Sequence, residues 1–194
     1  MHISIFASGS GSNAQRIIEY FREKGLQAEF SILTNNAQAY VIERAKQLEV
    51  PFKIVSRKAF KEAKDVLEFL EEKNAQLIVL AGFLQLVPEA LTQKYTRRII
   101  NIHPALLPKF GGKGMYGHFV HEAVVAAGEQ ESGITIHYVN ERYDEGEAIL
   151  QKSCPVETGD TPDDVARKVQ QLEHQYFPKV VEELAKQLSE KQGR

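Results

Sequence analysis

Residues 98–108 read Arg98-Ile99-Ile100-Asn101-Ile102-His103-Pro104-Ala105-Leu106-Leu107-Pro108. The β-branched apolar residues that open this stretch are typical of a buried strand. Proline cannot donate a ladder hydrogen bond, so Pro104 predicts that the strand ends at His103. Side chains alternate along a strand, and Asn101 and His103 should therefore face the same side.

This polar pair is a candidate ligand site. Ligands of open α/β sheets bind at the carboxyl ends of strands, where Asn101 offers a donor and His103 titrates near neutrality. The alternative is that both side chains only form structural hydrogen bonds with loop carbonyls.

Composition favours one compact domain that binds small molecules. The 194 residues carry 24 basic and 26 acidic side chains, a formal charge of -2. This balance argues against nucleic-acid or membrane partners. The first residues run directly into a strand without a signal-peptide pattern. The single cysteine, Cys154, cannot form an internal disulfide, so we expect a cytoplasmic protein.

Alternating strand and helix patterns predict an α/β fold. We expect strands near residues 2–7, 28–34, 52–55, 76–82 and 134–139, with another from 147, and helices after the first strand, near 39–48 and 58–73, and from 161. We therefore predict a single domain over residues 1–194, with a mainly parallel twisted sheet, helices on both faces and a Rossmann-like N-terminal half. Pro178 should kink or break the last helix.

A glycine turn, Ser8-Gly9-Ser10-Gly11-Ser12-Asn13, follows the first predicted strand. Glycines allow close backbone approach to a ligand, and free N–H groups at a helix start favour an anion, which predicts a phosphate monoester site. Residues 9–14 also match the G-x-G-x-x-A dinucleotide fingerprint, but residues 34–36, Thr-Asn-Asn, stand where that motif needs a ribose-binding acid. A purely structural turn is the third interpretation.

Further segments carry candidate residues. The glycine-rich residues 110–117 predict a mobile loop. His118 and His121, at helical spacing, could join His103 as zinc ligands, but without a supporting Cys or H-E-x-x-H context we expect exposed histidines and no metal. Residues 82–88 are either core or the wall of a pocket for a flat ring, and residues 140–146 could form an ordinary hairpin turn.

With Gly11-Ser12-Asn13, the segment at residues 101–108 and Asp144 in this order, the chain resembles the phosphoribosylglycinamide formyltransferases of the formyl-folate-dependent formyltransferase family, nearly end to end. The related methionyl-tRNA formyltransferases carry a further C-terminal domain, and formyltetrahydrofolate deformylases an N-terminal regulatory domain. We expect neither here. The resemblance implies direct transfer of a formyl group from the co-substrate 10-formyltetrahydrofolate to the amine of glycinamide ribonucleotide in de novo purine biosynthesis, without a metal. A homodimer and a monomer are both compatible with it.

The resemblance also implies roles for particular residues. Asn101 and protonated His103 would stabilise the oxyanion, and Asp144 would raise the pKa of His103 and orient its ring. Residues 1–100 would form the phosphate-binding half and residues 101–194 the catalytic and folate half. The ribonucleotide would be held by Gly11, Ser12, Asn13, Gln170 and Glu173, although an acid at the edge of a helix stripe is often only solvated. The folate would be held by Leu84, Gln85, Leu86, Val87, Asn101, Asn140, Glu141, Arg142, Tyr143 and Asp144.

The sequence also departs from the family pattern. Residues 111–116 are more glycine-rich than expected, and Asp144-Glu145-Gly146 replaces Asp-Gly-Gly. The basic residue that contacts folate has no clear counterpart among Arg57, Lys58, Lys61 and Lys64. Two rival classes are a nicotinamide-dependent oxidoreductase and a non-catalytic nucleotide-binding regulatory domain.

Overall fold

The computed structural model describes residues 1–192. The strands are β1 (His2–Phe6), β2 (Glu29–Thr34), β3 (Phe52–Ile54), β4 (Ala75–Leu80), β5 (Ile99–His103), β6 (Glu131–Tyr138) and β7 (Ala148–Pro155). The helices are α1 (Ser12–Glu23), α2 (Val41–Gln47), α3 (Arg57–Glu62), α4 (Lys64–Glu72), α5 (Glu89–Lys94), α6 (His118–Ala126) and α7 (Pro162–Gln192). No helix in this part of the chain combines the length and apolar character needed to cross a membrane.

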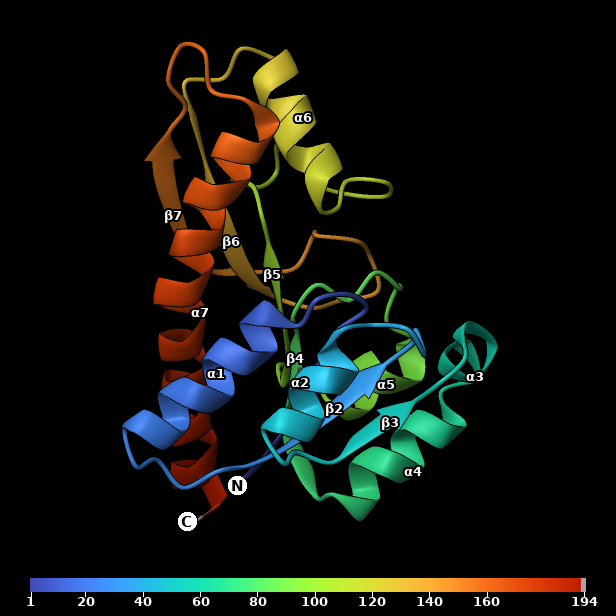
Figure 1. The fold of residues 1–194 in the computed structure, drawn as a ribbon. Coiled ribbons are helices and arrows are strands. Elements are labelled where there is room, and N and C mark those ends of the chain that lie inside the picture. The colour runs from blue at the N-terminus through green and yellow to red at the C-terminus, as the bar shows by residue number, and fades with distance from the viewer. Residues whose placement is uncertain (193–194) are drawn as a thin grey trace.

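The strands form one sheet in the order β3-β2-β1-β4-β5-β6-β7 (Figure 1). Pairing is parallel from β3 through β5, whereas β6 and β7 are antiparallel. The chain leaves β1 toward β2 and later returns on the other side of β1 with β4. This switch point is where open α/β sheets bind ligands. The predicted α/β class and mainly parallel sheet are confirmed.

Helices cover both faces of the sheet, as predicted. Ile3 and Ile5 of β1 are fully buried in one apolar cluster, which also contains side chains from α1, α2, α6 and α7. Phe6 points to the opposite face, where side chains of α3, α4 and α5 complete a second cluster. In Figure 1 α1 and α7 lie side by side on the first face. Because side chains alternate along each strand, β1 contributes to two separate cores, one on each face of the sheet.

Three predicted elements need correction. The helix expected near residues 58–73 is two helices, because Ala63 between them adopts a left-handed conformation with φ 60°. Pro178 does not break the last helix, which continues to Gln192. β6 begins at Glu131 and not at residue 134.

Helices α1 and α2 end in the same way. Gly25 after α1 and Glu49 after α2 both have positive φ, 63° and 54°. In each case the next N–H donates back into the helix, from Leu26 to Phe21 and from Val50 to Ala45, both at 2.9 Å. This is the Schellman arrangement, which favours glycine at the left-handed position.

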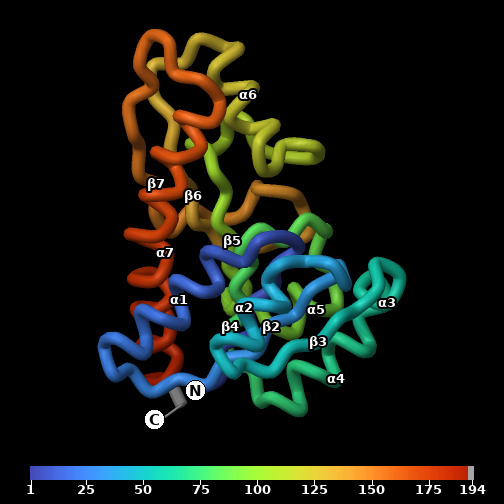
Figure 2. The backbone as a smooth tube through the Cα atoms, in the orientation of Figure 1, coloured from blue at the N-terminus to red at the C-terminus, as the bar shows by residue number. Residues whose placement is uncertain are grey.

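The two ends of the described chain lie together. The Met1 sulfur is 3.8 Å from the Ser189 hydroxyl of α7. Figure 2 shows both ends at the amino-terminal edge of the parallel strands, opposite the edge at which those strands end.

Candidate active site

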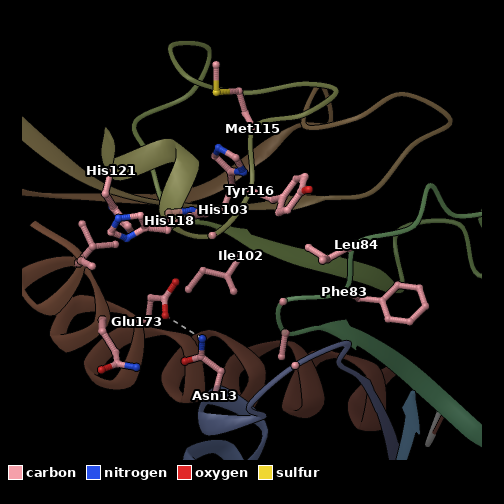
Figure 3. A pocket seen from close by; sticks show the side chains of 18 of the residues that line it. Asn13, Phe83, Leu84, Ile102, His103, Met115, Tyr116, His118, His121 and Glu173 are labelled. Carbon is pink, nitrogen blue, oxygen red and sulfur yellow. Dashed lines mark hydrogen bonds between the residues drawn. The ribbon is translucent and has the colours of Figure 1, made fainter. Parts of the chain in front are cut away.

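A cavity of about 830 Å³ lies at the carboxyl ends of β1, β4 and β5. Its walls come from the glycine turn, the loops after β4 and β5, residues 112–118, and one face of α7. In Figure 3, Glu173 and Asn13 lie on one side, His103 and Tyr116 on the opposite side, and Ile102 between them. Segments distant in sequence therefore meet at the switch point of the sheet.

The cavity brings together every residue predicted for catalysis and for the ribonucleotide: Asn101, His103, Asp144, Gly11, Ser12, Asn13, Gln170 and Glu173. Of the predicted folate residues, Leu84, Tyr143, Asn101 and Asp144 also line it, whereas Gln85, Leu86, Val87, Asn140, Glu141 and Arg142 do not. The basic residues of α3 and the start of α4 do not line it either.

β5 delivers the polar pair as the sequence pattern predicts. The strand ends at His103, directly before Pro104, and Asn101 and His103 both face the cavity. On the neighbouring antiparallel strand β6, His137 lies opposite Asn101 and Thr135 lies opposite His103. The Thr135 hydroxyl accepts from the Leu107 N–H at 3.0 Å and donates to the Ala105 carbonyl at 2.7 Å. Thr135 thereby holds the turn that follows His103.

Asp144 is the centre of a buried polar cluster. One carboxylate oxygen accepts from the Gly112 N–H at 3.0 Å and lies 3.5 Å from Nδ1 of His103. The other lies 3.4 Å from the Asn101 amide nitrogen and 3.6 Å from Nε2 of His137. Burial raises the pKa of Asp144, but the contacts with His137, His103 and Gly112 together hold its pKa below the ordinary value. The carboxylate is therefore charged at neutral pH.

His103 is almost fully buried, with 4% of its side chain exposed. Its Nε2 lies 2.8 Å from the Phe110 carbonyl, which can only accept, so Nε2 carries a proton. Burial lowers the pKa of His103, and this effect outweighs the charge of Asp144, which raises it. Asp144 has the predicted upward effect on the pKa of His103, but the larger effect of burial leaves that pKa below its ordinary value. Nδ1, beside Asp144, is the position that gains a proton.

His137 is a cluster member that sequence reasoning missed. Its Nδ1 donates to the Tyr138 carbonyl at 2.8 Å, and its Nε2 lies 3.1 Å from the Asn101 amide nitrogen and 3.6 Å from the Asp144 carboxylate. The alternation of β6 placed Thr135 and His137 on one face, which is a weak signal. Only the register against β5 connects that face to Asn101 and His103.

The glycine turn has the expected strand-turn-helix geometry. Gly11 caps α1 with φ 74° and ψ 21°. A Cβ at Gly11 would lie 2.3 Å from the Val41 side chain, so both backbone conformation and space require glycine. The first N–H groups of α1 lack intrahelical partners and face the cavity end of the sheet, an arrangement that attracts anions.

Asn13 and Glu173 link α1 to α7 in the cavity wall. The Asn13 amide donates to a Glu173 carboxylate oxygen at 2.9 Å, and the Asn13 carbonyl oxygen is buried without a hydrogen-bond partner among the described residues. Burial raises the pKa of Glu173, and the Asn13 hydrogen bond opposes this only in part. An amine that enters here would meet an acceptor from each side chain.

Of the two helical histidines, His118 has the predicted exposed side chain and His121 does not. His118 is 51% exposed, whereas His121 is 6% exposed, and burial lowers the pKa of His121 to about 4. Within residues 1–192 no three histidine, cysteine or acidic side chains are grouped so that they could hold a metal ion. Residues 112–118 supply cavity wall, including Met115 and Tyr116, which the sequence did not single out.

Comparison with known proteins identifies related chains. The sequence model of the formyl transferase family matches residues 1–181. The chain is 39% identical over 191 residues to a chloroplastic phosphoribosylglycinamide formyltransferase of Vigna unguiculata, covering 95% of this chain but only 61% of that protein, so it spans less than two thirds of that relative. The phosphoribosylglycinamide formyltransferase of Bacillus subtilis is 36% identical over 93% of both chains. The crystal structure of that enzyme from Bacillus Halodurans superposes with a TM-score of 0.87 at 37% identity over 95% of both chains.

Proposed function

The chain belongs to the formyl transferase family, and from this premise we propose that it is a phosphoribosylglycinamide formyltransferase. It transfers the formyl group of 10-formyltetrahydrofolate to the amine of N1-(5-phospho-D-ribosyl)glycinamide, a step of de novo purine biosynthesis. The observation that carries the proposal is one cavity holding an anion cradle, an amine acceptor and a buried Asn-His-Asp cluster.

The ribonucleotide occupies the side of the cavity formed by α1 and α7. Its phosphate accepts hydrogen bonds from the backbone N–H groups of Gly11, Ser12 and Asn13. Glu173 and the unpartnered carbonyl oxygen of Asn13 receive the glycinamide portion. Gln170, one turn before Glu173 on α7, lines the same wall.

The folate enters from the side of Leu84 and Tyr143. Both side chains are exposed, at 49% and 37%, and both line the cavity, as expected for surfaces that a flat ring covers. The same two loops also contain Gln85, Leu86, Val87 and residues 140–142. These residues contact the folate only if it extends beyond the cavity or if the loops move onto it. This scheme uses no metal. We also propose a cytoplasmic location, on the ground that the chain has a single cysteine.

The reaction is a direct transfer. The substrate amine attacks the formyl carbon, a C–N bond forms, and the bond from that carbon to N10 of the folate breaks. One proton leaves the amine and one reaches N10. Asn101 donates to the developing oxyanion, a group that preorganised donors stabilise. Nδ1 of His103, beside the Asp144 carboxylate, takes up the amine proton and returns it to N10.

The test is an assay with glycinamide ribonucleotide and 10-formyltetrahydrofolate, followed by the absorbance of the released folate. We expect turnover with both substrates and a loss of about 10²-fold or more in His103→Ala, with ligand affinities nearly unchanged. Glu145→Gln, a neighbour of Asp144 outside the cavity wall, is the matched control. Tight NADH binding without ribonucleotide affinity would show that the glycine turn serves a dinucleotide, and the proposal would be wrong.

A further inference from the structure

Two neighbouring peptide groups of the glycine turn are held from outside by α2. The Val41 N–H donates to the Gly9 carbonyl at 3.1 Å. The Nε of Arg44 donates to the Ser10 carbonyl at 2.8 Å. Both hydrogen bonds come from the start of α2, which lies on the side of the glycine turn away from the cavity.

These bonds fix the direction of the N–H groups that face the other way. In a trans peptide the carbonyl and the following N–H point in opposite directions. A Ser10 carbonyl held outward by Arg44 therefore holds the Gly11 N–H inward. Glycine turns allow such a peptide to flip, and a flipped peptide would place a carbonyl oxygen where an anion binds.

Arg44 also brings charge that no acid neutralises directly. Glu43, its sequence neighbour, pairs with Lys46 at 2.7 Å, and no carboxylate of residues 1–192 forms an ion pair with Arg44. Its guanidinium also donates to the Gln15 side chain, and only through Gln15 does it reach Glu19. The guanidinium carbon lies 5.0 Å from the Tyr40 ring centroid, a contact that restricts its position.

The charge of Arg44 acts beyond its hydrogen bonds. His174 lies on α7, one residue after Glu173. Burial lowers the pKa of His174, and the charges of Arg16 and Arg44 lower it further. The positive field of Arg44 thus extends to α7, which forms the other wall of the ribonucleotide side.

We propose that Arg44 is a positioning residue for the substrate phosphate, which it orients through the Ser10 carbonyl and attracts with an unpaired charge, without contacting it. This inference rests on the phosphate placement in the proposed function. It assigns to α2 the task of keeping the anion cradle open in the correct orientation.

The test compares Arg44→Gln and Arg44→Lys with Arg22→Gln. Arg22 is a matched control, because it also donates to a backbone carbonyl, but to that of Leu48 at the end of α2, at 2.7 Å, and not to the glycine turn. The probes for calorimetry are ribose 5-phosphate, glycinamide ribonucleotide and its dephosphorylated form.

We expect Arg44→Gln to weaken binding of both phosphorylated probes about tenfold, the order of one charge-assisted interaction, and to leave the dephosphorylated probe unchanged. The affinity of Arg44→Lys for the phosphorylated probes should lie between those of Arg44→Gln and the wild type, because lysine keeps the positive charge but lacks the planar guanidinium that donates in two directions. KM should rise for the ribonucleotide and not for the formyl folate. Arg44→Lys alone carries the test if Arg44→Gln does not fold.

Equal weakening of all three probes, or wild-type affinity in both Arg44 variants, would overturn the inference. Failure of the proposed function gives a different pattern. If the wild-type protein showed no formyl transfer, the proposed reaction would be wrong. If the Arg44 variants nevertheless bound ribose 5-phosphate more weakly than the wild type, the role of Arg44 would still hold.

Discussion

Asp144 contacts Gly112 in the loop after β5, Asn101 and His103 on β5, and His137 on β6, and it does so from a left-handed backbone conformation with φ 56°. A charged carboxylate that is 11% exposed needs such partners, since an unpaired buried charge is costly. The neighbouring Gly146 has no room for a side chain, because a Cβ there would lie 1.7 Å from the Tyr138 carbonyl. The backbone conformation of this loop therefore fixes the position of the Asp144 carboxylate.

Replacing this carboxylate should change the titration of His103. Burial lowers the pKa of His103 and Asp144 opposes that effect, so Asp144→Asn should lower the pKa of His103 further. NMR titration of the ring protons measures this directly, and the acidic limb of the rate profile should move to lower pH with a fall in kcat. Glu145→Gln should change neither quantity. An unchanged profile in folded Asp144→Asn would remove Asp144 from the mechanism.

Glu173 should distinguish the two substrates. Glu173→Ala removes the acceptor that faces the amine-bearing substrate, so the Kd of the ribonucleotide should rise about tenfold or more while the folate Kd stays near the wild-type value. Calorimetric titration of each ligand separates the two effects. Equal losses for both ligands would instead mean that Glu173 serves the packing of α7 against α1.

At the level of elements, the ends of α1 and α2 provide a matched pair. Both have the same hydrogen-bond pattern and a left-handed residue, but α1 has Gly25 there and α2 has Glu49. A left-handed conformation costs a residue with a side chain roughly 1 kcal/mol relative to glycine. The end of α2 therefore carries strain that the end of α1 lacks.

Glycine at position 49 should relieve this strain. Glu49 is exposed, so Glu49→Gly loses little packing, and we expect the free energy of unfolding to rise by about 1 kcal/mol. Gly25→Ala should lower it by about the same amount, since a Cβ at Gly25 meets nothing within 4 Å and only the backbone strain changes. Urea unfolding measures both. Destabilisation by Glu49→Gly would show that the Glu49 side chain has a stabilising contact in solution.

For the whole molecule, local patterns were enough to predict the fold class and the position of the polar pair. The apolar run of β4 and the proline after His103 are local signals, and both predictions hold. The pairing of His137 with Asn101 depends on the register between strands separated by a long connection, which no local pattern encodes. The pKa of His103 depends on its burial, which results from the packed whole. The proposed ligand roles of the cavity residues stay predictions.

Stability should fall in mild acid. Burial lowers the pKa of His2, His103, His121 and His174, that of His121 to about 4 from 6.5. Their contribution is complete above the unfolded pKa near 6.5 and is lost as the pH falls toward the folded values, because the unfolded chain then binds more protons. For His121 alone the linkage amounts to about 3 kcal/mol between pH 6.5 and 4.

Replacing His121 should flatten that dependence. In His121→Leu the free energy of unfolding, measured in urea at several pH values, should decline less between pH 6.5 and 4 than in the wild type. His118→Gln, at an exposed histidine on the same helix, is the control: it removes only the smaller effect of His118 on the pKa of His121, so its slope should change much less than that of His121→Leu. A wild-type slope in His121→Leu would mean that His121 becomes protonated without unfolding, for example by turning outward with residues 112–118.

The neighbouring positions of Met1 and Ser189 determine how the protein can be attached to other molecules. Both lie at the edge of the sheet opposite the cavity, so a tag, a solid support or a second polypeptide joined near either end would leave the cavity mouth free (Figure 2). A short linker between the two ends should also permit a circularly permuted chain, reopened at an exposed loop away from the glycine turn. For reagents and sensors, this end of the molecule is the point of attachment.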